Sequence, residues 1–138
     1  MTGLAFFDSN VLVYTEDSSV PAKQKRAAHL WNQHFRSGTA LLSVQVLQEY
    51  FSAVTRKLGV DARVAQRRVE VFSTANVITF DAADVVSAIE LHRLMGTSFW
   101  DALILHAARN GGANVLYSED FQHGAILASV RVVNPFAS

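Results

Sequence analysis

Residues 4–10, which read LAFFDSN, decide the fold, because an unbroken apolar run ends there at the carboxylate of Asp8. Apolar runs without alternation are typical of strands that are buried on both faces. Such a strand needs helices on both sides of its sheet. Asp8 then follows the carboxyl end of the strand, where α/β sheets form their binding sites. A helix N-cap or an Asx-turn also explains an aspartate at this junction.

Four more short apolar runs repeat this pattern, at residues 40–43, 77–80, 114–117 and 130–133. The segments between them have helical length, and their ends carry N-cap, proline and glycine signals. These signals are Pro21, Gly38, Gly59, Asp61, Asp81, Gly96, Ser98 and Gly111. The alternation predicts a three-layer α/β/α sandwich with a short, mostly parallel central sheet of about five strands.

Composition limits the chemistry of the chain. Its 138 residues are 50% hydrophobic, which predicts one folded domain over residues 1–138. The formal net charge is zero, so the chain as a whole has no excess positive charge that would attract nucleic acid. No apolar run is long enough to span a membrane and no signal peptide is evident, so a cytoplasmic location is expected. The absence of cysteine excludes disulfides, thiol nucleophiles and cysteine-bound metals. Any reaction must therefore use oxygen and nitrogen ligands.

A glutamate lies on the second predicted helix, at residues 44–58. Its apolar residues Leu47, Phe51, Val54 and Leu58 recur at helical spacing and predict the buried stripe. Glu49 follows Leu47 by two positions and therefore points roughly 200° around the helix, away from this stripe. Solvent exposure is the simpler interpretation of this residue. Its place in the first two turns after a strand keeps a role in a cleft open.

Two aspartates complete the set of acids. Asp101 opens the helix FWDALILHAA, which is apolar nearly all round and is predicted to be buried. Asp101 also fits a capping box with Ser98. This alternative explains how the carboxylate is stabilised, but not why a buried helix begins with a charged residue. Asp120 follows the apolar run at residues 114–117, and either a site or a first helical turn accounts for it equally well.

The four acids Asp8, Glu49, Asp101 and Asp120 are all predicted at the same edge of a parallel sheet. Crowded carboxylates repel one another unless a cation joins them. Hard oxygen ligands suit Mg²⁺, for which Mn²⁺ is able to substitute. Such a site supports metal-assisted hydrolysis of a phosphodiester.

Four short motifs resemble the PIN-domain family, and more closely its VapC-type ribonuclease toxins. They are residues 7–12 (FDSNVL), 47–50 (LQEY), 99–102 (FWDA) and 116–121 (LYSEDF). The resemblance implies that Asp8, Glu49, Asp101 and Asp120 are the catalytic metal ligands. It further implies that Asn10 and Ser118 orient these ligands or the attacking water. Some members carry another acid where this chain has Gln122, which bears on whether a second metal is held.

The resemblance also implies a function. The expected protein is a Mg²⁺-dependent endoribonuclease toxin that leaves 5′-phosphate and 3′-hydroxyl ends and is neutralised by a cognate antitoxin. A homodimer is expected, with the apolar helices around Trp31 and Phe51 as surface for either contact. The basic residues that are candidates for contacts with RNA phosphates are Lys23, Lys25, Arg26, Arg56 and Lys57.

Two other functions fit parts of the same pattern. A non-catalytic RNA-binding or protein-interaction domain would keep the fold, and loss of one acid would indicate it. An aspartate-dependent phosphatase would place a second aspartate two residues after the first, where this chain has Asn10. The five histidines lack the spacing of a zinc site, and only His123 lies near enough to an acid to touch a substrate.

Overall fold

The computed structural model describes residues 3–137, and its centre is a six-stranded sheet with the order β3-β2-β1-β4-β6-β5. All neighbouring strands are parallel except β5, which runs antiparallel to β6. The strands are β1 (Ala5–Phe7), β2 (Ala40–Ser43), β3 (Asn76–Ile78), β4 (Val115–Tyr117), β5 (Ile126–Leu127) and β6 (Val130–Val133). The predicted mostly parallel sheet is confirmed, with β5 as an additional edge strand.

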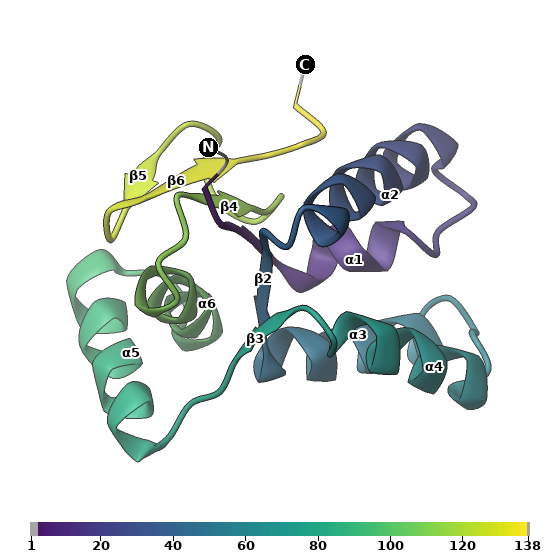
Figure 1. The fold of residues 1–138 in the computed structure, drawn as a ribbon. Helices are drawn as coiled ribbons and strands as arrows, with labels where there is room; N and C mark the ends of the chain where they lie inside the picture. The colour runs from purple at the N-terminus through teal and green to yellow at the C-terminus, as the bar shows by residue number, and fades with distance from the viewer. Residues whose placement is uncertain (1–2, 138) are drawn as a thin grey trace.

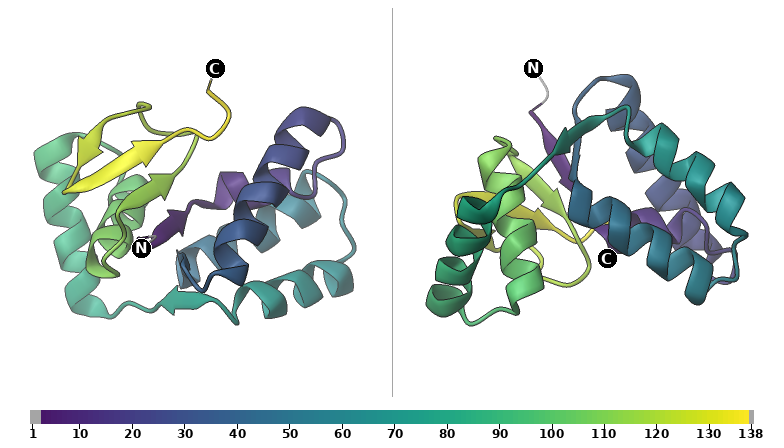
Figure 2. Two further views of the ribbon diagram at one scale, coloured as in Figure 1. Left: turned by 45° about the horizontal axis from the view of Figure 1, so that its top comes forward. Right: turned by 90° about the horizontal axis from the view of Figure 1, so that it is seen from below.

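The helices lie on both sides of this sheet. They are α1 (Ser9–Tyr14), α2 (Pro21–Arg36), α3 (Val44–Arg56), α4 (Ala62–Phe72), α5 (Ala82–Met95) and α6 (Phe99–Asn110). Helices α5 and α6 pack together on one side, and α1 and α2 pack together on the other (Figure 1). Helix α3 contacts both α1 and α4, and the two further views show these helices grouped away from the α5–α6 pair (Figure 2). The expected three-layer arrangement is therefore confirmed.

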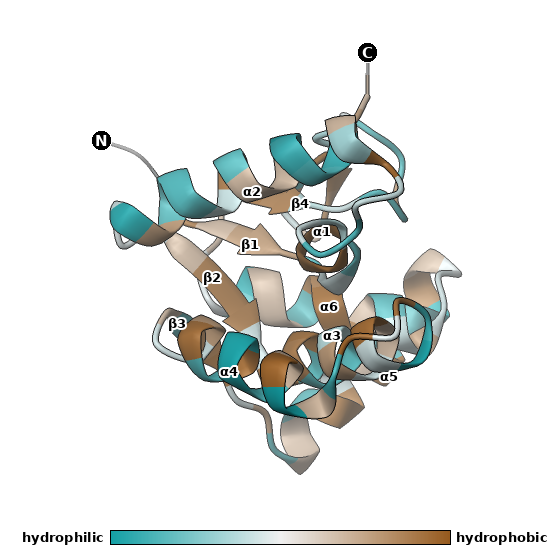
Figure 3. Cartoon of the chain, turned by 90° about the vertical axis from the view of Figure 1, so that its right-hand side faces the viewer, coloured by the Kyte–Doolittle hydropathy of each residue, from teal (hydrophilic) through white to brown (hydrophobic). Residues whose placement is uncertain are grey.

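The core forms around β1 and β2, every residue of which is buried. In Figure 3 these strands are coloured as hydrophobic, whereas much of α2 is hydrophilic. Phe7 of β1 meets Trp31 of α2 edge to face, with ring centroids 5.1 Å apart. Trp31 is only 5% exposed, so its own side chain adds nothing to the contact surface expected around it. Its ring fills the layer between the sheet and α2.

The predicted stripe of α3 was also partly wrong. Helix α3 buries Val46, Tyr50 and Val54 in the core and Gln45 beside the first turn of α6. Phe51 is 39% exposed, and with Leu47 it lines an apolar groove toward α4. Helix α3 therefore has two apolar faces, one on the core and one beside α4, and only Val54 of the predicted stripe is fully buried.

Capping residues fix where the helices begin. Asp61, Asp81 and Ser98 cap α4, α5 and α6, as the sequence predicts. Ser98 accepts a hydrogen bond from the Asp101 backbone N–H at 3.1 Å. Because α6 starts at this cap, Asp101 is held in its first turn.

The sheet register brings two segments of the site together. Phe7 of β1 lies opposite Tyr117 of β4 in the parallel ladder. The next residues, Asp8 and Ser118, therefore leave the sheet side by side, and the Asp8 backbone N–H donates to the Tyr117 carbonyl at 3.0 Å. Within residues 3–137, none of the helices is long and apolar enough to cross a membrane.

Candidate functional site

Asp8 is the most buried acid of the site, with 3% of its side chain exposed. One carboxylate oxygen accepts a hydrogen bond from the Ser9 backbone N–H at 2.7 Å, which makes Asp8 the N-cap of α1. The other accepts from the Ser118 hydroxyl, also at 2.7 Å. Burial raises the pKa of Asp8 to about 7 and outweighs these hydrogen bonds, while the charges of Asp120 and Glu49 raise it further. Asp8 is thus both a cap and a buried acid that faces other acids.

Ser118 connects the first and last acids. Its buried hydroxyl donates to Asp8 and accepts from the backbone N–H of Asp120 at 3.1 Å. Asn10 adds a second link, because its side-chain amide donates to the Ser118 hydroxyl at 3.4 Å and accepts from the Glu119 backbone N–H at 3.3 Å. Asn10 and Ser118 therefore hold the loop after β4 against the start of α1.

Glu49 is held from two directions. The Ser9 hydroxyl donates to one of its carboxylate oxygens at 2.9 Å, and the Gln45 amide donates to the other at 3.2 Å. The same amide donates to the Trp100 carbonyl at 3.1 Å, so Gln45 links α3 to the first turn of α6. Ser9 and Gln45 are site residues that the sequence did not predict. The only signal for Gln45 was its position one helical turn before Glu49.

Asp101 faces the same group of acids from α6. Burial is the main cause that raises its pKa, and the charges of Asp120 and Glu49 raise it further, whereas the hydrogen bond with Ser98 lowers it. Asp120 itself is exposed. Asp8 and Asp101 thus each lie within electrostatic reach of both Asp120 and Glu49.

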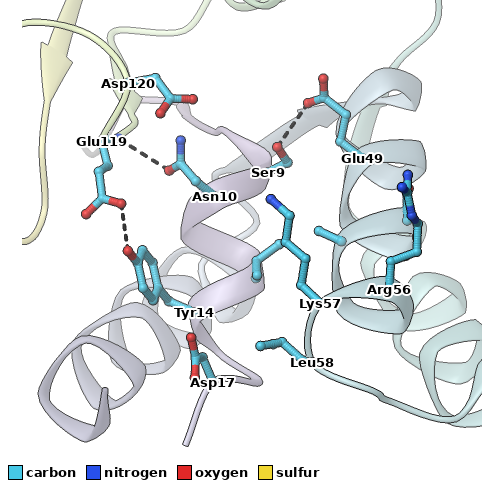
Figure 4. Close-up of a pocket in the computed structure, with 13 residues that line it drawn as sticks. Ser9, Asn10, Tyr14, Asp17, Glu49, Arg56, Lys57, Leu58, Glu119 and Asp120 are labelled. Atoms are coloured by element: carbon cyan, nitrogen blue, oxygen red, sulfur yellow. Dashed lines mark hydrogen bonds between the residues drawn. The ribbon is translucent and has the colours of Figure 1, made fainter. Parts of the chain in front are cut away.

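A groove of about 720 Å³ is lined by two of these acids, Glu49 and Asp120. Its polar lining consists of Ser9, Asn10, Tyr14, Ser52, the acids Asp17, Glu49, Glu119 and Asp120, and the cations Arg56 and Lys57. Figure 4 shows Glu119 and Asp120 across the groove from Arg56, Lys57 and Glu49, with α1 between the two sides. Asp8 and Asp101 are not among its lining residues.

The five predicted RNA-contacting residues differ in where they lie. Arg56 and Lys57 line the groove, and neither forms an ion pair with any residue in the part of the chain that the structure describes. Lys23 instead pairs with Glu119 at 2.7 Å, and Arg26 donates to the Pro135 carbonyl at 3.3 Å. Lys25 is exposed on α2 and does not line the groove. The geometry therefore favours Arg56 and Lys57 as contacts for an anion in the groove.

The donor set of the site bears on whether a divalent cation fits there. Among residues 3–137, no three aspartate, glutamate or histidine side chains are grouped so that they would hold an ion directly as they stand. Mg²⁺, however, commonly keeps several waters and uses only one or two protein carboxylates. Every donor here is a hard oxygen, and burial together with mutual repulsion raises the pKa of Asp8 and Asp101. By its chemistry, this donor set fits a hydrated Mg²⁺ or Mn²⁺.

The histidines lie apart from the acids of the site. His34 and His106 are buried, and His106 pairs with Asp84 at 2.8 Å. His123 is exposed, and its ring accepts a hydrogen bond from the Asn134 backbone N–H at 3.0 Å. None of the histidines lines the groove among the described residues.

Comparison with known proteins assigns the family. Residues 5–126 match the PIN domain, whereas no curated protein matches the sequence. VapC20 of Mycobacterium tuberculosis, described as a sarcin-ricin loop cleaving toxin, has 23% sequence identity and a TM-score of 0.70, covering 92% of this chain and 98% of that one. A toxin–antitoxin complex from Klebsiella pneumoniae has 19% sequence identity and a TM-score of 0.67, and the match covers 96% of this chain and 98% of that one. DNA-bound VapBC from Salmonella typhimurium has 15% sequence identity and a TM-score of 0.68, and the match covers 95% of this chain and 97% of that one. The chain belongs to the PIN-domain family.

Proposed function

We propose that this protein is an endoribonuclease that uses Mg²⁺, or Mn²⁺ in its place, to hydrolyse RNA phosphodiester bonds. One observation carries the proposal. Glu49 and Asp120 line a groove together with two cations that have no acidic partner among the described residues, and the buried acids Asp8 and Asp101 each lie within electrostatic reach of both Glu49 and Asp120. The acids suit a divalent cation, and the two cations suit the phosphates of a nucleic acid.

Asp8, Glu49, Asp101 and Asp120 would hold the metal ion, either directly or through its water molecules. When bound, the ion would lower the pKa of a water molecule and stabilise the negative charge that develops on the phosphate. The contribution of the chain is to fix these ligands. Ser118 and Asn10 hold the loop that carries Asp120, and Ser9 and Gln45 fix the Glu49 carboxylate.

Arg56 and Lys57 would bind RNA phosphates next to the bond that is cut. Their support is their position in the groove and their freedom from ion pairs with described residues. Attack by water from the face opposite the leaving 3′-oxygen then gives a 5′-phosphate and a 3′-hydroxyl end. No histidine lines the groove among residues 3–137, so an acid–base mechanism through the ribose 2′-hydroxyl lacks its usual catalyst there.

The natural setting that we propose is a toxin–antitoxin pair. The support is that several structures with this fold are toxin–antitoxin or VapBC complexes. A cognate antitoxin would neutralise the acids with a basic side chain, and the toxin would form a homodimer. Expression of the chain alone is then expected to arrest growth, and co-expression of the adjacent gene is expected to restore it. Harmless expression of an active nuclease would exclude the toxin role.

The mechanism is tested by the ends of the products. Total cellular RNA is incubated with the purified protein in Mg²⁺ and, separately, in chelator. Fragments are expected only with Mg²⁺, and their 5′ ends should accept an adapter that ligates only to 5′-phosphate. Ends that carry 2′,3′-cyclic phosphate would overturn the mechanism. RNA that is bound but left intact in Mg²⁺ would instead favour a non-catalytic RNA-binding domain.

A further inference from the structure

Glu119 is a further acid in the lining of the groove, next to Asp120. Both of its carboxylate oxygens already have partners. The Tyr14 hydroxyl donates to one at 2.7 Å, and the Lys23 amine donates to the other at 2.7 Å (Figure 4 shows the tyrosine contact). Its negative charge is thus balanced by Lys23, and its side chain is turned toward α1 and α2. The Glu119 carboxylate therefore attaches its loop to α1 and α2.

The two partners of Glu119 are themselves held in place. The Lys23 amine also donates to the Tyr14 hydroxyl at 3.3 Å and lies 4.8 Å from the centre of the Tyr14 ring. Phe136 packs on the same group, with its ring centroid 4.9 Å from that of Tyr14 and 5.4 Å from the Lys23 amine. We call Tyr14, Lys23, Glu119 and Phe136 the Tyr14 clamp. It joins the end of α1, the first turn of α2 and the segment after β6.

The clamp is attached to the loop that carries Asp120. No hydrogen bond from residues 3–137 reaches the Asp120 carboxylate, so the backbone of its loop determines where that carboxylate lies. Three contacts hold Glu119 and Asp120 of this loop: the Asp120 N–H on Ser118, the Glu119 N–H on Asn10, and the Glu119 side chain in the clamp. The third contact is the only one of the three that lies outside the acidic site itself.

We infer that Tyr14 and Lys23 are positioning residues, which fix Asp120 for metal binding through their hold on Glu119. This inference rests on the proposed metal-dependent function. It assigns Lys23 to the support of the metal site, whereas the sequence alone made it a candidate for RNA contact.

Positioning and simple electrostatics predict opposite results for one variant. Lys23→Met removes a cation near the acids and leaves the Glu119 carboxylate without its counter-charge. Charge alone would then strengthen binding of a divalent cation, because the groove becomes more negative. Loss of positioning would weaken it, because a partner that orients a metal ligand commonly contributes about 10–100-fold to metal affinity.

The experiment measures Mn²⁺ binding without RNA, by electron paramagnetic resonance of the free ion, for the full chain and its variants. Lys23→Met and Tyr14→Phe are each expected to raise the Mn²⁺ dissociation constant by about 10-fold. Tyr14→Phe removes one hydroxyl and changes no charge. Lys23→Arg, which retains the cation beside Glu119, is expected to restore most of the affinity.

Arg68→Met is the matched control, because it breaks another ion pair, between Arg68 and Glu16 at 2.9 Å, and neither residue lines the groove. It is expected to leave Mn²⁺ affinity unchanged. Unchanged or tighter binding by Lys23→Met and Tyr14→Phe, with normal binding by the wild type, would overturn this inference alone. A wild type that binds no Mn²⁺ would overturn the proposed function together with it.

Discussion

Asp8 couples the stability of the protein to pH at the level of one residue. Its pKa is about 7 in the fold, chiefly because it is buried, against an ordinary value of 3.8. Between these two values the folded protein holds a proton that the unfolded chain has lost, so this group makes the fold less stable as pH rises. Asp8→Asn cannot titrate. In chelator, urea unfolding is expected to show the variant gaining stability relative to the wild type from pH 4 to pH 7. A difference that stays constant with pH would contradict the raised pKa.

The hydroxyl of Ser118 is expected to contribute both to stability and to metal binding. Ser118→Ala removes the hydrogen bond to Asp8 and leaves the Asp120 N–H without its partner. Leaving one buried polar group unpaired costs about 1–3 kcal/mol. Lower free energy of unfolding and weaker Mn²⁺ binding are both expected, by chemical denaturation and spin resonance. Ser118→Thr keeps the hydroxyl and should retain metal binding. Equal Mn²⁺ affinity in the alanine variant would show that Ser118 does not orient the site.

The sequence singled out Asp8, Asp101 and Asp120 because each follows a strand or opens a helix, and Glu49 because it lies in the first two turns of a helix after a strand. That the four acids form one metal site stays a prediction. The sequence did not predict the residues that hold them. Ser9 contacts Glu49 across 40 positions of the chain, and Lys23 contacts Glu119 across 96. Polar partners so distant in sequence leave no local pattern. Only the packing of α1 against α3, and of α2 near the loop after β4, brings them together.

At the scale of elements, the buried strands were predictable because a short apolar run without alternation is typical of a strand that helices cover on both faces. Strand β5 was not, because two residues at a sheet edge leave no periodic signal. The N-cap interpretation of Asp8 allowed a helix after β1, but the bounds of α1 were not predicted, because it has only six residues and follows its cap directly. The face of α3 was misassigned because periodicity identifies an apolar stripe without identifying its neighbour, which for Leu47 and Phe51 is α4.

The α5–α6 pair carries an acid-sensitive contact. His106 of α6 lies 2.8 Å from Asp84 in the first turn of α5, and this hydrogen bond is the main cause of the lowered pKa of Asp84. A lowered carboxylate pKa stabilises the fold above the ordinary value of 3.8, and this stabilisation is lost as pH falls through the lowered pKa. Asp84→Asn is expected to melt at a lower temperature than the wild type at pH 7, with the gap closing in acid. Equal melting temperatures at pH 7, by circular dichroism, would show that the contact contributes nothing.

For the whole molecule, the distribution of charge matters more than its sum. The net charge is zero, yet the groove gathers four acids and two cations in one lining, and the two cations have no ion-pair partner among the described residues. RNA affinity is therefore expected to depend on a few local cations. In chelator, Lys57→Met should weaken the binding of a single-stranded RNA and reduce the slope of log affinity against log salt by about 0.7. Fluorescence anisotropy across a salt series measures both.

Lys25→Met is the matched control for this prediction. Lys25 is an exposed lysine of the same charge that does not line the groove. The variant should bind RNA with the affinity and salt slope of the wild type. An equal loss for the two lysines would mean that RNA follows α2 and that the groove is not its main contact.

The central claim, that the four carboxylates form a metal-dependent nuclease site, is tested most directly at Asp8. Wild type, Asp8→Asn and Asp8→Ala are compared for RNA cleavage in Mg²⁺ and for the rise in melting temperature that Mn²⁺ gives over chelator. Asp8→Asn should cleave no RNA, melt in chelator no lower than the wild type, and gain less from Mn²⁺, because a ligand stabilises only through the site that it binds. Loss of the helix cap alone costs about 0.5–2 kcal/mol with or without metal. If Asp8→Asn keeps full nuclease activity while Asp8→Ala melts markedly lower in chelator, Asp8 is a structural cap and the proposed metal site is wrong.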